Sequence, residues 1–241
     1  MASSYISSMR AIILAGGLGT RISEETESKP KPMVLIGDKP ILWHVKNIYA
    51  SQGITDFIIA TGYKSEVIHD WVSTLKESWS IKPIDTGLET QTAGRIKQCI
   101  QSVQDPRFFV TYGDGLGNID LEKLLLLHER SSKIATVTAV RPPARFGVLE
   151  SNKGEVIHFG EKRQTDAGWI NGGFFVVENE IANLIKQADE SFEAFTLPKL
   201  VTRKQLGAYH HEGYWQPMDT LREKNILTEL ASSGSPPWFQ S

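Results

Sequence analysis

The stretch Arg10-Ala-Ile-Ile-Leu-Ala-Gly-Gly-Leu-Gly-Thr-Arg21 joins a continuous apolar run to a glycine-rich segment. A short apolar run that stops at glycine is typical of a buried parallel strand that opens into a loop. The next helical pattern of apolar residues begins only after Pro40. The sequence therefore predicts a strand from Arg10 to Ala15, followed by a long loop that continues to about Pro32.

Short apolar runs and helical patterns alternate from here to about residue 140. Strands are predicted at 57–61, 82–85, 107–112 and 134–140, and helices at 41–53, 67–75, 96–103 and after Asp120, which can cap its helix. This alternation predicts the α/β class, with a doubly wound, Rossmann-like sheet and right-handed crossovers. Ligands of such sheets bind beyond the C-terminal ends of the strands, so the loops 16–32 and 113–118 should meet in one crevice.

The pattern changes after residue 140. Two short strands, 146–150 and 155–159, flank Ser151-Asn-Lys-Gly154 and predict a hairpin, and Trp169–Val177 is predicted as a further strand. Helices are predicted near 178–187 and 219–231, followed by a Pro/Ser-rich tail at 232–241. We interpret this half as a small β-rich extension of a mixed sheet that carries a second substrate.

Composition excludes several classes of protein. The 241 residues carry a formal net charge of −2, which argues against nucleic acid or an anionic membrane as the partner. The lone Cys99 excludes an internal disulfide framework and a multi-cysteine metal site. No apolar run approaches the roughly 20 residues of a membrane-spanning helix, and residues 1–8 lack a signal-peptide pattern. We therefore expect a cytoplasmic protein.

The glycine-rich segment is a candidate phosphate site. Glycines let backbone N–H groups approach phosphate oxygens, and Arg21 and Lys31 add positive charge. A dinucleotide fingerprint starting at Gly17 would need glycine where Ile22 stands, and the lysine of a Walker A loop is absent. The alternative is a tight turn without a ligand. Because nearby glutamates cancel the basic charge of this loop, a bound polyphosphate would also need a metal ion.

Two aspartates are candidate metal ligands. Asp114 lies between two glycines at the end of a predicted strand, where a hard carboxylate oxygen suits Mg²⁺. Asp219, at the start of the last predicted helix, is the candidate second ligand. The alternative for Asp219 is an N-cap of that helix.

Polar groups also interrupt the predicted strands of the second half. Glu161-Lys162 follows one strand, and Asn171-Gly172-Gly173 interrupts another. Carboxylates and amides bind sugar hydroxyls, and lysine binds phosphate. The alternatives are a surface ion pair and a β-bulge.

Together these motifs resemble the sugar-phosphate nucleotidyltransferases, over nearly the whole chain from Arg10. The motifs that carry the resemblance are Leu14-Ala-Gly-Gly-Leu-Gly-Thr-Arg21, Lys29-Pro-Lys-Pro-Met33, Gly113-Asp114, Glu161-Lys162 and Asn171-Gly-Gly173. Further segments resemble the glucose-1-phosphate cytidylyltransferases within that family: Ser23-Glu-Glu-Thr26, Pro40-Ile-Leu-Trp-His44, Asp85-Thr-Gly87, Arg145-Phe-Gly147, Tyr214-Trp-Gln-Pro-Met-Asp-Thr-Leu-Arg222 and Pro237-Trp238.

The resemblance implies a fold of the nucleotide-diphospho-sugar transferase type, with a single domain at residues 9–241. Residues 9–140 would bind the nucleotide and residues 141–231 the sugar phosphate, while residues 1–8 would form a flexible N-terminus. It also implies a homo-oligomer, for which an exposed Trp238-Phe239 tail is the candidate contact.

The resemblance further implies a reaction in which an oxygen of glucose 1-phosphate attacks the α-phosphorus of CTP, giving CDP-glucose and pyrophosphate. Arg21 and Lys31 would be the catalytic residues, and Asp114 and Asp219 would hold Mg²⁺. The implied nucleotide-binding residues are Leu14, Ala15, Gly16, Gly17, Gly19, Thr20, Arg21, Lys31, Thr92, Ala93, Gly94, Tyr112, Gly113 and Asp114. The implied substrate-binding residues are Gly147, Glu161, Lys162, Asn171 and Gly172.

Two alternatives stay open from the sequence. The same transfer can use a different nucleoside triphosphate, another sugar phosphate or a small-molecule phosphate, because specificity is a difference between competing affinities. The other alternative is a nucleotide-binding protein without turnover.

Overall fold

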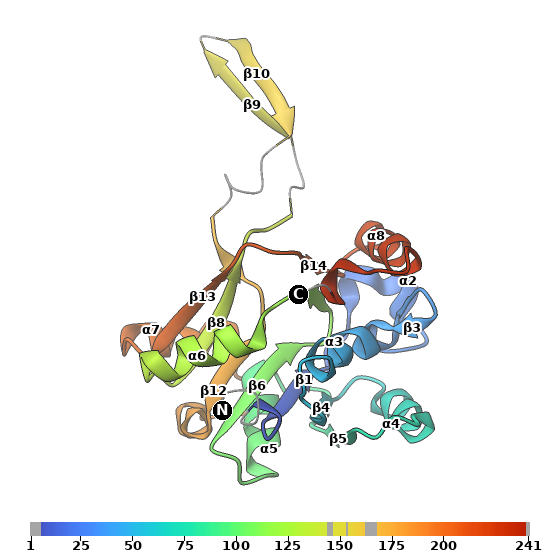
Figure 1. The fold of residues 1–241 in the computed structure, drawn as a ribbon, viewed down its shortest axis with the longest axis vertical. Helices are drawn as coiled ribbons and strands as arrows, with labels where there is room; N and C mark the ends of the chain where they lie inside the picture. The colour runs from blue at the N-terminus through green and yellow to red at the C-terminus, as the bar shows by residue number, and fades with distance from the viewer. Residues whose placement is uncertain (1–5, 144–146, 153, 162–167, 240–241) are drawn as a thin grey trace.

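The protein folds around one eight-stranded mixed sheet (Figure 1). This computed structural model describes residues 6–143, 147–152, 154–161 and 168–239. In spatial order the strands are β11 (Ile170–Asn171), β8 (Ala135–Val140), β12 (Phe175–Glu178), β6 (Arg107–Tyr112), β1 (Arg10–Leu14), β4 (Asp56–Thr61) and β5 (Ser80–Asp85), and β13 (Leu206–His211) pairs with β8. Strands β6, β1, β4 and β5 are parallel, whereas β12 is antiparallel to β6 and β8.

Helices cover both faces of this sheet. The described α-helices are α2 (Ser23–Thr26), α3 (Ile41–Ala50), α4 (Ser65–Thr74), α5 (Thr92–Gln101), α6 (Leu121–Ser131), α7 (Leu197–Thr202) and α8 (Leu221–Ser232). Successive side chains of a strand point to opposite faces. Accordingly, Ala11 and Ile13 of β1 enter a core formed with α3 and α6, whereas Ile12 and Leu14 enter a second core formed with α5. The predicted doubly wound α/β fold is confirmed.

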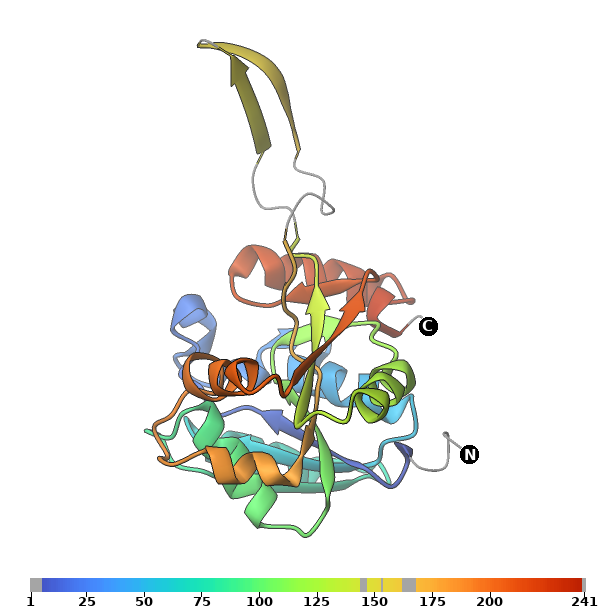
Figure 2. The ribbon, with the colours of Figure 1, turned by 90° about the vertical axis from the view of Figure 1, so that its left-hand side faces the viewer.

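Three small antiparallel pairs lie outside the main sheet. Strands β9 (Gly147–Asn152) and β10 (Glu155–Glu161) form the predicted hairpin, which stands apart from the main body in both views (Figures 1 and 2). Strand β7 (Gly115–Gly117), inside the segment predicted as a loop, pairs with β14 (Trp215–Pro217). Strands β2 (Leu35–Ile36) and β3 (Lys39–Pro40) form the third pair.

The prediction of one strand over Trp169–Val177 is wrong. The strand is interrupted between β11 and β12, where Gly173 and Phe174 have φ angles of 77° and 47°. This turn places the Phe174 ring in the core that contains α3, where it stacks on Tyr49 at a centroid distance of 5.7 Å. From Phe174 to Val177 the side chains alternate between the two cores, so the alternation of a strand holds from Phe174 onward and the interruption precedes it.

The predicted helix near 178–187 is present only in part, as the 3-10 helix Asn179–Leu184. Ile185 then adopts an extended conformation, with its side chain buried in the core formed with α5. The Lys97 ammonium donates a hydrogen bond to the carbonyl of Ile185 at 2.9 Å. Burial of this side chain therefore ends the helical turn early.

The C-terminal tail is packed rather than exposed. Pro237–Phe239 forms a short helical turn, and Trp238 is only 1% exposed, with its ring edge-on to His44 of α3. The expected exposed Trp238 contact is therefore wrong, because its indole fills a gap in the core. At the other end, Ile6 is 4% exposed and belongs to the same core. The division into residues 9–140 and 141–231 stays a prediction.

None of the helices in the described part of the chain is long and apolar enough to cross a membrane, and the longest α-helix, α8, has 12 residues.

Candidate active site

A pocket of about 490 Å³ lies at the C-terminal ends of β1 and β6. The segments after both strands line it, so the prediction that the two loops meet in one crevice is confirmed. Within the predicted loop 16–32, the structure forms a 3-10 turn at Thr20–Ile22, helix α2, and another 3-10 turn at Lys31–Met33.

Most of the predicted nucleotide-binding residues line this pocket: Leu14, Ala15, Gly16, Gly17, Gly19, Thr20, Arg21, Lys31, Thr92, Tyr112, Gly113 and Asp114. Ala93 and Gly94 are not among the lining residues. The Ala93 side chain is fully buried in the core formed with α5, and Gly94 lies against Ala188, whose carbonyl oxygen would be 2.1 Å from an added Cβ. These two residues therefore serve the packing of α5.

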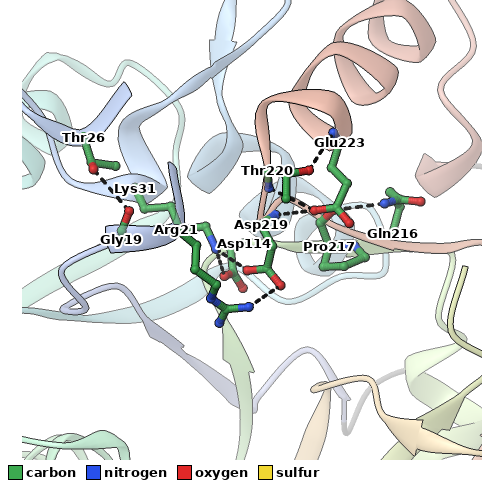
Figure 3. Close-up of polar contacts among 10 residues, drawn as sticks. All are labelled: Gly19, Arg21, Thr26, Lys31, Asp114, Gln216, Pro217, Asp219, Thr220 and Glu223. Atoms are coloured by element: carbon green, nitrogen blue, oxygen red, sulfur yellow. Dashed lines mark hydrogen bonds and ion pairs between the residues drawn. The ribbon is translucent and has the colours of Figure 1, made fainter. Parts of the chain in front are cut away.

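Lys31 lies between the two predicted metal ligands (Figure 3). Its Nζ is 2.6 Å from Asp114 Oδ2 and 2.8 Å from Asp219 Oδ1, and its side chain is only 10% exposed. Burial disfavours the charged ammonium, but the two carboxylates outweigh burial and raise the pKa of Lys31. The structure thus brings together a catalytic candidate and both metal candidates from segments 83 and 188 residues apart.

Asp219 is not the N-cap of the last helix. Helix α8 is capped by Thr220, whose hydroxyl accepts a hydrogen bond from the Glu223 backbone N–H at 3.2 Å, while Glu223 accepts from the Thr220 N–H. Glu223 Oε2 also accepts from the backbone N–H of Asp219 at 2.7 Å. This capping box leaves the Asp219 carboxylate to bind Lys31 and Arg21, as Figure 3 shows.

Arg21 is the most solvent-accessible cation of this cluster. Its Nη1 is 2.7 Å from Asp219 Oδ2, yet 74% of its side chain is exposed. An exposed ion pair is weak, so this guanidinium can turn toward an arriving phosphate at little cost.

Two glycines let the backbone come close to its neighbours at the site. Gly19 has a φ of 66°, and an added Cβ would lie 2.9 Å from both Lys31 and Thr26. At Gly113 an added Cβ would lie 2.9 Å from the carbonyl oxygen of Leu14. Glycine at 113 therefore lets the ends of β1 and β6 approach each other, and glycine at 19 lets the loop pack against Lys31 and Thr26.

Arg95 ends the segment 92–95, for which the resemblance implies contact with the base and ribose, and it lines the pocket. Its buried guanidinium, 4% exposed, donates hydrogen bonds to the carbonyls of Thr61, Gly16 and Gly87, which lie at or just after the ends of β4, β1 and β5. Burial lowers the pKa of this guanidinium, and the charge of Asp85 opposes that effect. An added Cβ on Gly16 would lie 2.2 Å from the same group. Arg95 thus ties three strand ends together in the pocket wall.

The predicted sugar-side residues are only partly described. Asn171 Nδ2 donates to Tyr112 Oη at 3.0 Å, and Asn171 Oδ1 accepts from the Gly173 N–H at 2.8 Å. At Gly172 an added Cβ would lie 2.6 Å from Val140. The Gly172 carbonyl accepts a hydrogen bond from the Trp215 indole N–H at 2.9 Å.

Gly147 begins β9 and Glu161 ends β10, directly opposite each other in the hairpin. Lys162 lies outside the described residues.

The sequence predicted no role for Glu193, and Trp215 was named only as part of the motif 214–222. Glu193 accepts a hydrogen bond from Tyr112, 81 residues away along the chain, and lies in a segment without any glycine or charge motif. Only the fold reveals such a residue.

The donor set of the site fits a magnesium ion. No group of three or more His, Cys, Asp or Glu side chains in the described parts of the chain is arranged to hold a metal. Mg²⁺, however, is typically bound by one or two carboxylates together with substrate phosphates and water. Asp114 and Asp219, on either side of one ammonium group, supply such a pair.

Comparisons with known proteins agree with this geometry. The nucleotidyl transferase family matches residues 10–221. Over 253 aligned positions the chain is 42% identical to glucose-1-phosphate cytidylyltransferase from Salmonella typhimurium, covering 95% of this chain and 98% of the relative. It is 31% identical to mannose-1-phosphate guanyltransferase from Yarrowia lipolytica, covering 91% of this chain and 62% of the relative.

Solved structures give the same result. HddC from Yersinia pseudotuberculosis, complexed with GMP-PN, is 26% identical, with a TM-score of 0.71 over 92% of this chain and 98% of HddC. The inositol-1-phosphate CTP transferase from T. maritima shares the fold, with a TM-score of 0.68 at 16% identity over 95% of this chain and 98% of that chain. A family match over most of the chain, together with a relative of nearly equal length, shows that this chain belongs to the nucleotidyl transferase family.

Proposed function

We propose that this chain is a Mg²⁺-dependent cytidylyltransferase that joins CTP and α-D-glucose 1-phosphate, giving CDP-glucose and pyrophosphate. The observation that carries the proposal is the cluster of Lys31, Asp114 and Asp219 at the glycine-lined pocket. The identity to the Salmonella typhimurium enzyme, over almost the full length of both chains, supports the choice of substrates.

The chain's own residues act by positioning and by neutralising charge. Backbone N–H groups of the segment around Gly16 and Gly17 would hold the nucleotide phosphates. Lys31 would bind the α-phosphate, and Arg21 would neutralise the departing pyrophosphate. Asp114 and Asp219 would hold Mg²⁺, which when bound neutralises phosphate charge. The attacking group is a phosphate oxygen that is already anionic, so no general base is needed.

The remaining assignments belong to the same proposal. The predicted nucleotide-binding residues that line the pocket keep their proposed roles, whereas Ala93 and Gly94 do not. Gly147, Glu161 and Lys162 keep their proposed roles toward the sugar phosphate. A cytoplasmic homo-oligomer is also proposed, and sedimentation velocity would measure its size.

Pyrophosphate release tests the proposed function. The purified protein would be incubated with Mg²⁺ and each of CTP, UTP, ATP, GTP and dTTP, against glucose 1-phosphate and other sugar phosphates. We expect release with CTP plus glucose 1-phosphate and much less with the other pairs. Release only with another pair of substrates would favour a different activity within the family, as in the relative named mannose-1-phosphate guanyltransferase. Nucleotide binding without release would identify a protein without turnover.

The metal assignment predicts that Asp114→Asn and Asp219→Asn each lower turnover by at least about a hundredfold. An amide removes the negative charge that holds Mg²⁺ but keeps the shape of the side chain, so the fold should survive. Glu229→Gln, an exposed change on α8, is the matched control. Initial rates over a range of Mg²⁺ concentrations measure the effect, and full activity in both aspartate variants would refute the assignment.

A further inference from the structure

Glu193 connects hydroxyl groups that belong to different elements around the pocket. Its Oε1 accepts a hydrogen bond from Tyr112 Oη at 2.5 Å, and its Oε2 accepts one from Thr92 Oγ1 at 2.7 Å. Tyr112 ends β6 and Thr92 begins α5. Both line the pocket, whereas Glu193 stands behind them.

Each of these hydroxyl groups has already used its only hydrogen. A hydroxyl carries one hydrogen and two lone pairs. Thr92 donates its hydrogen to Glu193 and accepts from the Phe192 backbone N–H at 2.8 Å. Tyr112 donates to Glu193 and accepts from Asn171 Nδ2 at 3.0 Å. Each hydroxyl is left with a lone pair for a ligand but without a hydrogen to offer it.

The arrangement depends on Glu193 being a pure acceptor of hydrogen bonds from both hydroxyl groups. An ionised carboxylate has acceptors only. An amide at position 193 would donate to one hydroxyl, which would then be free to turn its own hydrogen toward the pocket.

Packing and a further hydrogen bond restrict the movement of these side chains. The Tyr112 ring lies edge-on to Phe175 at 6.0 Å, and an added Cβ on Gly173 would be 2.9 Å from it. The Ser191 hydroxyl also donates to Glu193 Oε2, at 2.8 Å. The carboxylate is therefore held in place from both sides.

We propose that Glu193 is a positioning residue that sets specificity, because it fixes this wall of the pocket as an acceptor of hydrogen bonds. The wall then selects ligand groups that donate, and this inference rests on the proposed function. The donors available in the proposed substrates are the amino group of cytosine and the hydroxyl groups of ribose and glucose. The oxygen that replaces that amino group in uracil cannot donate, nor can a deoxy carbon.

The test compares wild type with Glu193→Gln on substrate pairs in which one member lacks a donor group at a defined position. The pairs are CTP with UTP, CTP with 2′-deoxy-CTP, and glucose 1-phosphate with 2-deoxyglucose 1-phosphate. We expect the variant to reduce the kcat/KM preference for the donor about tenfold in at least one pair, and that pair identifies which group faces the wall. A merely structural defect would lower both members of each pair alike, so unchanged ratios in all three pairs overturn the inference.

Two controls keep the outcomes distinct. Glu229→Gln, exposed on α8, should leave every ratio unchanged. If wild type releases no pyrophosphate, the proposed function fails, and calorimetric binding of CTP, UTP and 2′-deoxy-CTP to wild type and Glu193→Gln decides the inference instead. If Glu193→Gln does not fold, Tyr112→Phe and Thr92→Val replace it. At least one of these two variants should lower the kcat/KM preference in one substrate pair. Unchanged ratios in both variants overturn the inference.

Discussion

Lys31 neutralises two carboxylates that the proposed reaction needs for a metal ion. Its ammonium contacts Asp114 and Asp219 at hydrogen-bond distance in a largely buried position. Removing two adjacent carboxylates from water without a cation would be costly. In the protein without substrates, the Lys31 ammonium therefore acts as the counter-ion of Asp114 and Asp219, and a divalent cation has to displace it.

We predict that Lys31→Met increases the affinity for Mn²⁺ in the absence of nucleotide by about tenfold, while turnover falls. The neutral side chain fills similar space but no longer competes for the carboxylates. Electron paramagnetic resonance titration of free Mn²⁺ would measure the affinity. Lys29→Met is the matched control, since Lys29 lies in the same segment but faces Glu25 at 4.0 Å. Weaker binding of Mn²⁺ by Lys31→Met would show that the lysine does not compete.

At the scale of elements, α3 packs against α4 and the start of β5 through one buried cation. Lys46 of α3 is fully buried, with its Nζ 3.8 Å from the Trp79 ring centroid and 5.4 Å from that of Trp71. Its ammonium has no hydrogen-bond partner among the described residues. Burial lowers the pKa of Lys46 to about 8, and the charge of Glu77 opposes this shift. The aromatic rings stabilise the charge that remains.

This contact predicts a pH dependence of stability. In the unfolded chain Lys46 keeps its proton up to its ordinary pKa of 10.5, whereas the folded protein releases it near pH 8. Between these values the unfolded state binds more protons, so the free energy of unfolding should rise with pH. Below about pH 8 both states are protonated, and the cost of burying the charge is fully present.

Lys46→Met should abolish this rise. Urea unfolding of wild type and Lys46→Met from pH 7 to pH 10.5 would measure the free energy of unfolding of each. We expect the difference between the two free energies to change by about 3 kcal/mol over this range, at about 1.4 kcal/mol for each unit of pKa. Lys39→Met, which changes a lysine over Trp43 near the surface, is the control. A constant difference across this range would mean that Lys46 stays charged in the fold.

At the scale of the whole molecule, the C-terminal turn closes over the N-terminal half. Trp238 lies edge-on to His44 at 5.5 Å and against Tyr214 at 6.1 Å, which brings α3 and the segment before β14 together. His44 is in turn fixed by a hydrogen bond between its Nε2 and the carbonyl of Ile36 at 3.0 Å. The tail therefore stabilises the fold through contacts between residues that are far apart in the sequence, such as Trp238 and His44.

We predict that Trp238→Ala lowers the free energy of unfolding by about 3–5 kcal/mol, as large buried aromatic side chains do when truncated. Phe239→Ala, which removes a partly buried neighbour, should cost clearly less. Urea unfolding monitored by circular dichroism would measure both. Equal small losses in the two variants would mean that the tail is not an integral part of the core.

The sequence by itself determined the layers of the fold and the chemistry of the site. Short apolar runs that end at glycine, such as Arg10–Leu14, are typical of strands buried on both faces of a sheet. The glycines around Gly17 and Asp114 at a strand end indicate phosphate and metal binding by their residue type and position alone. Local propensity and residue chemistry act over a few residues, so a pattern reveals them.

Only the tertiary structure decided which distant groups meet. The break after Asn171, the burial of Trp238 and the hydrogen bonds of Arg95 and Glu193 depend on packing between segments far apart in the chain. Whether a side chain is buried, paired or exposed is set by the neighbours that the fold supplies, and those neighbours leave no trace in the local sequence. For this reason the candidate ligands could be predicted, whereas the residues that hold them in place could not.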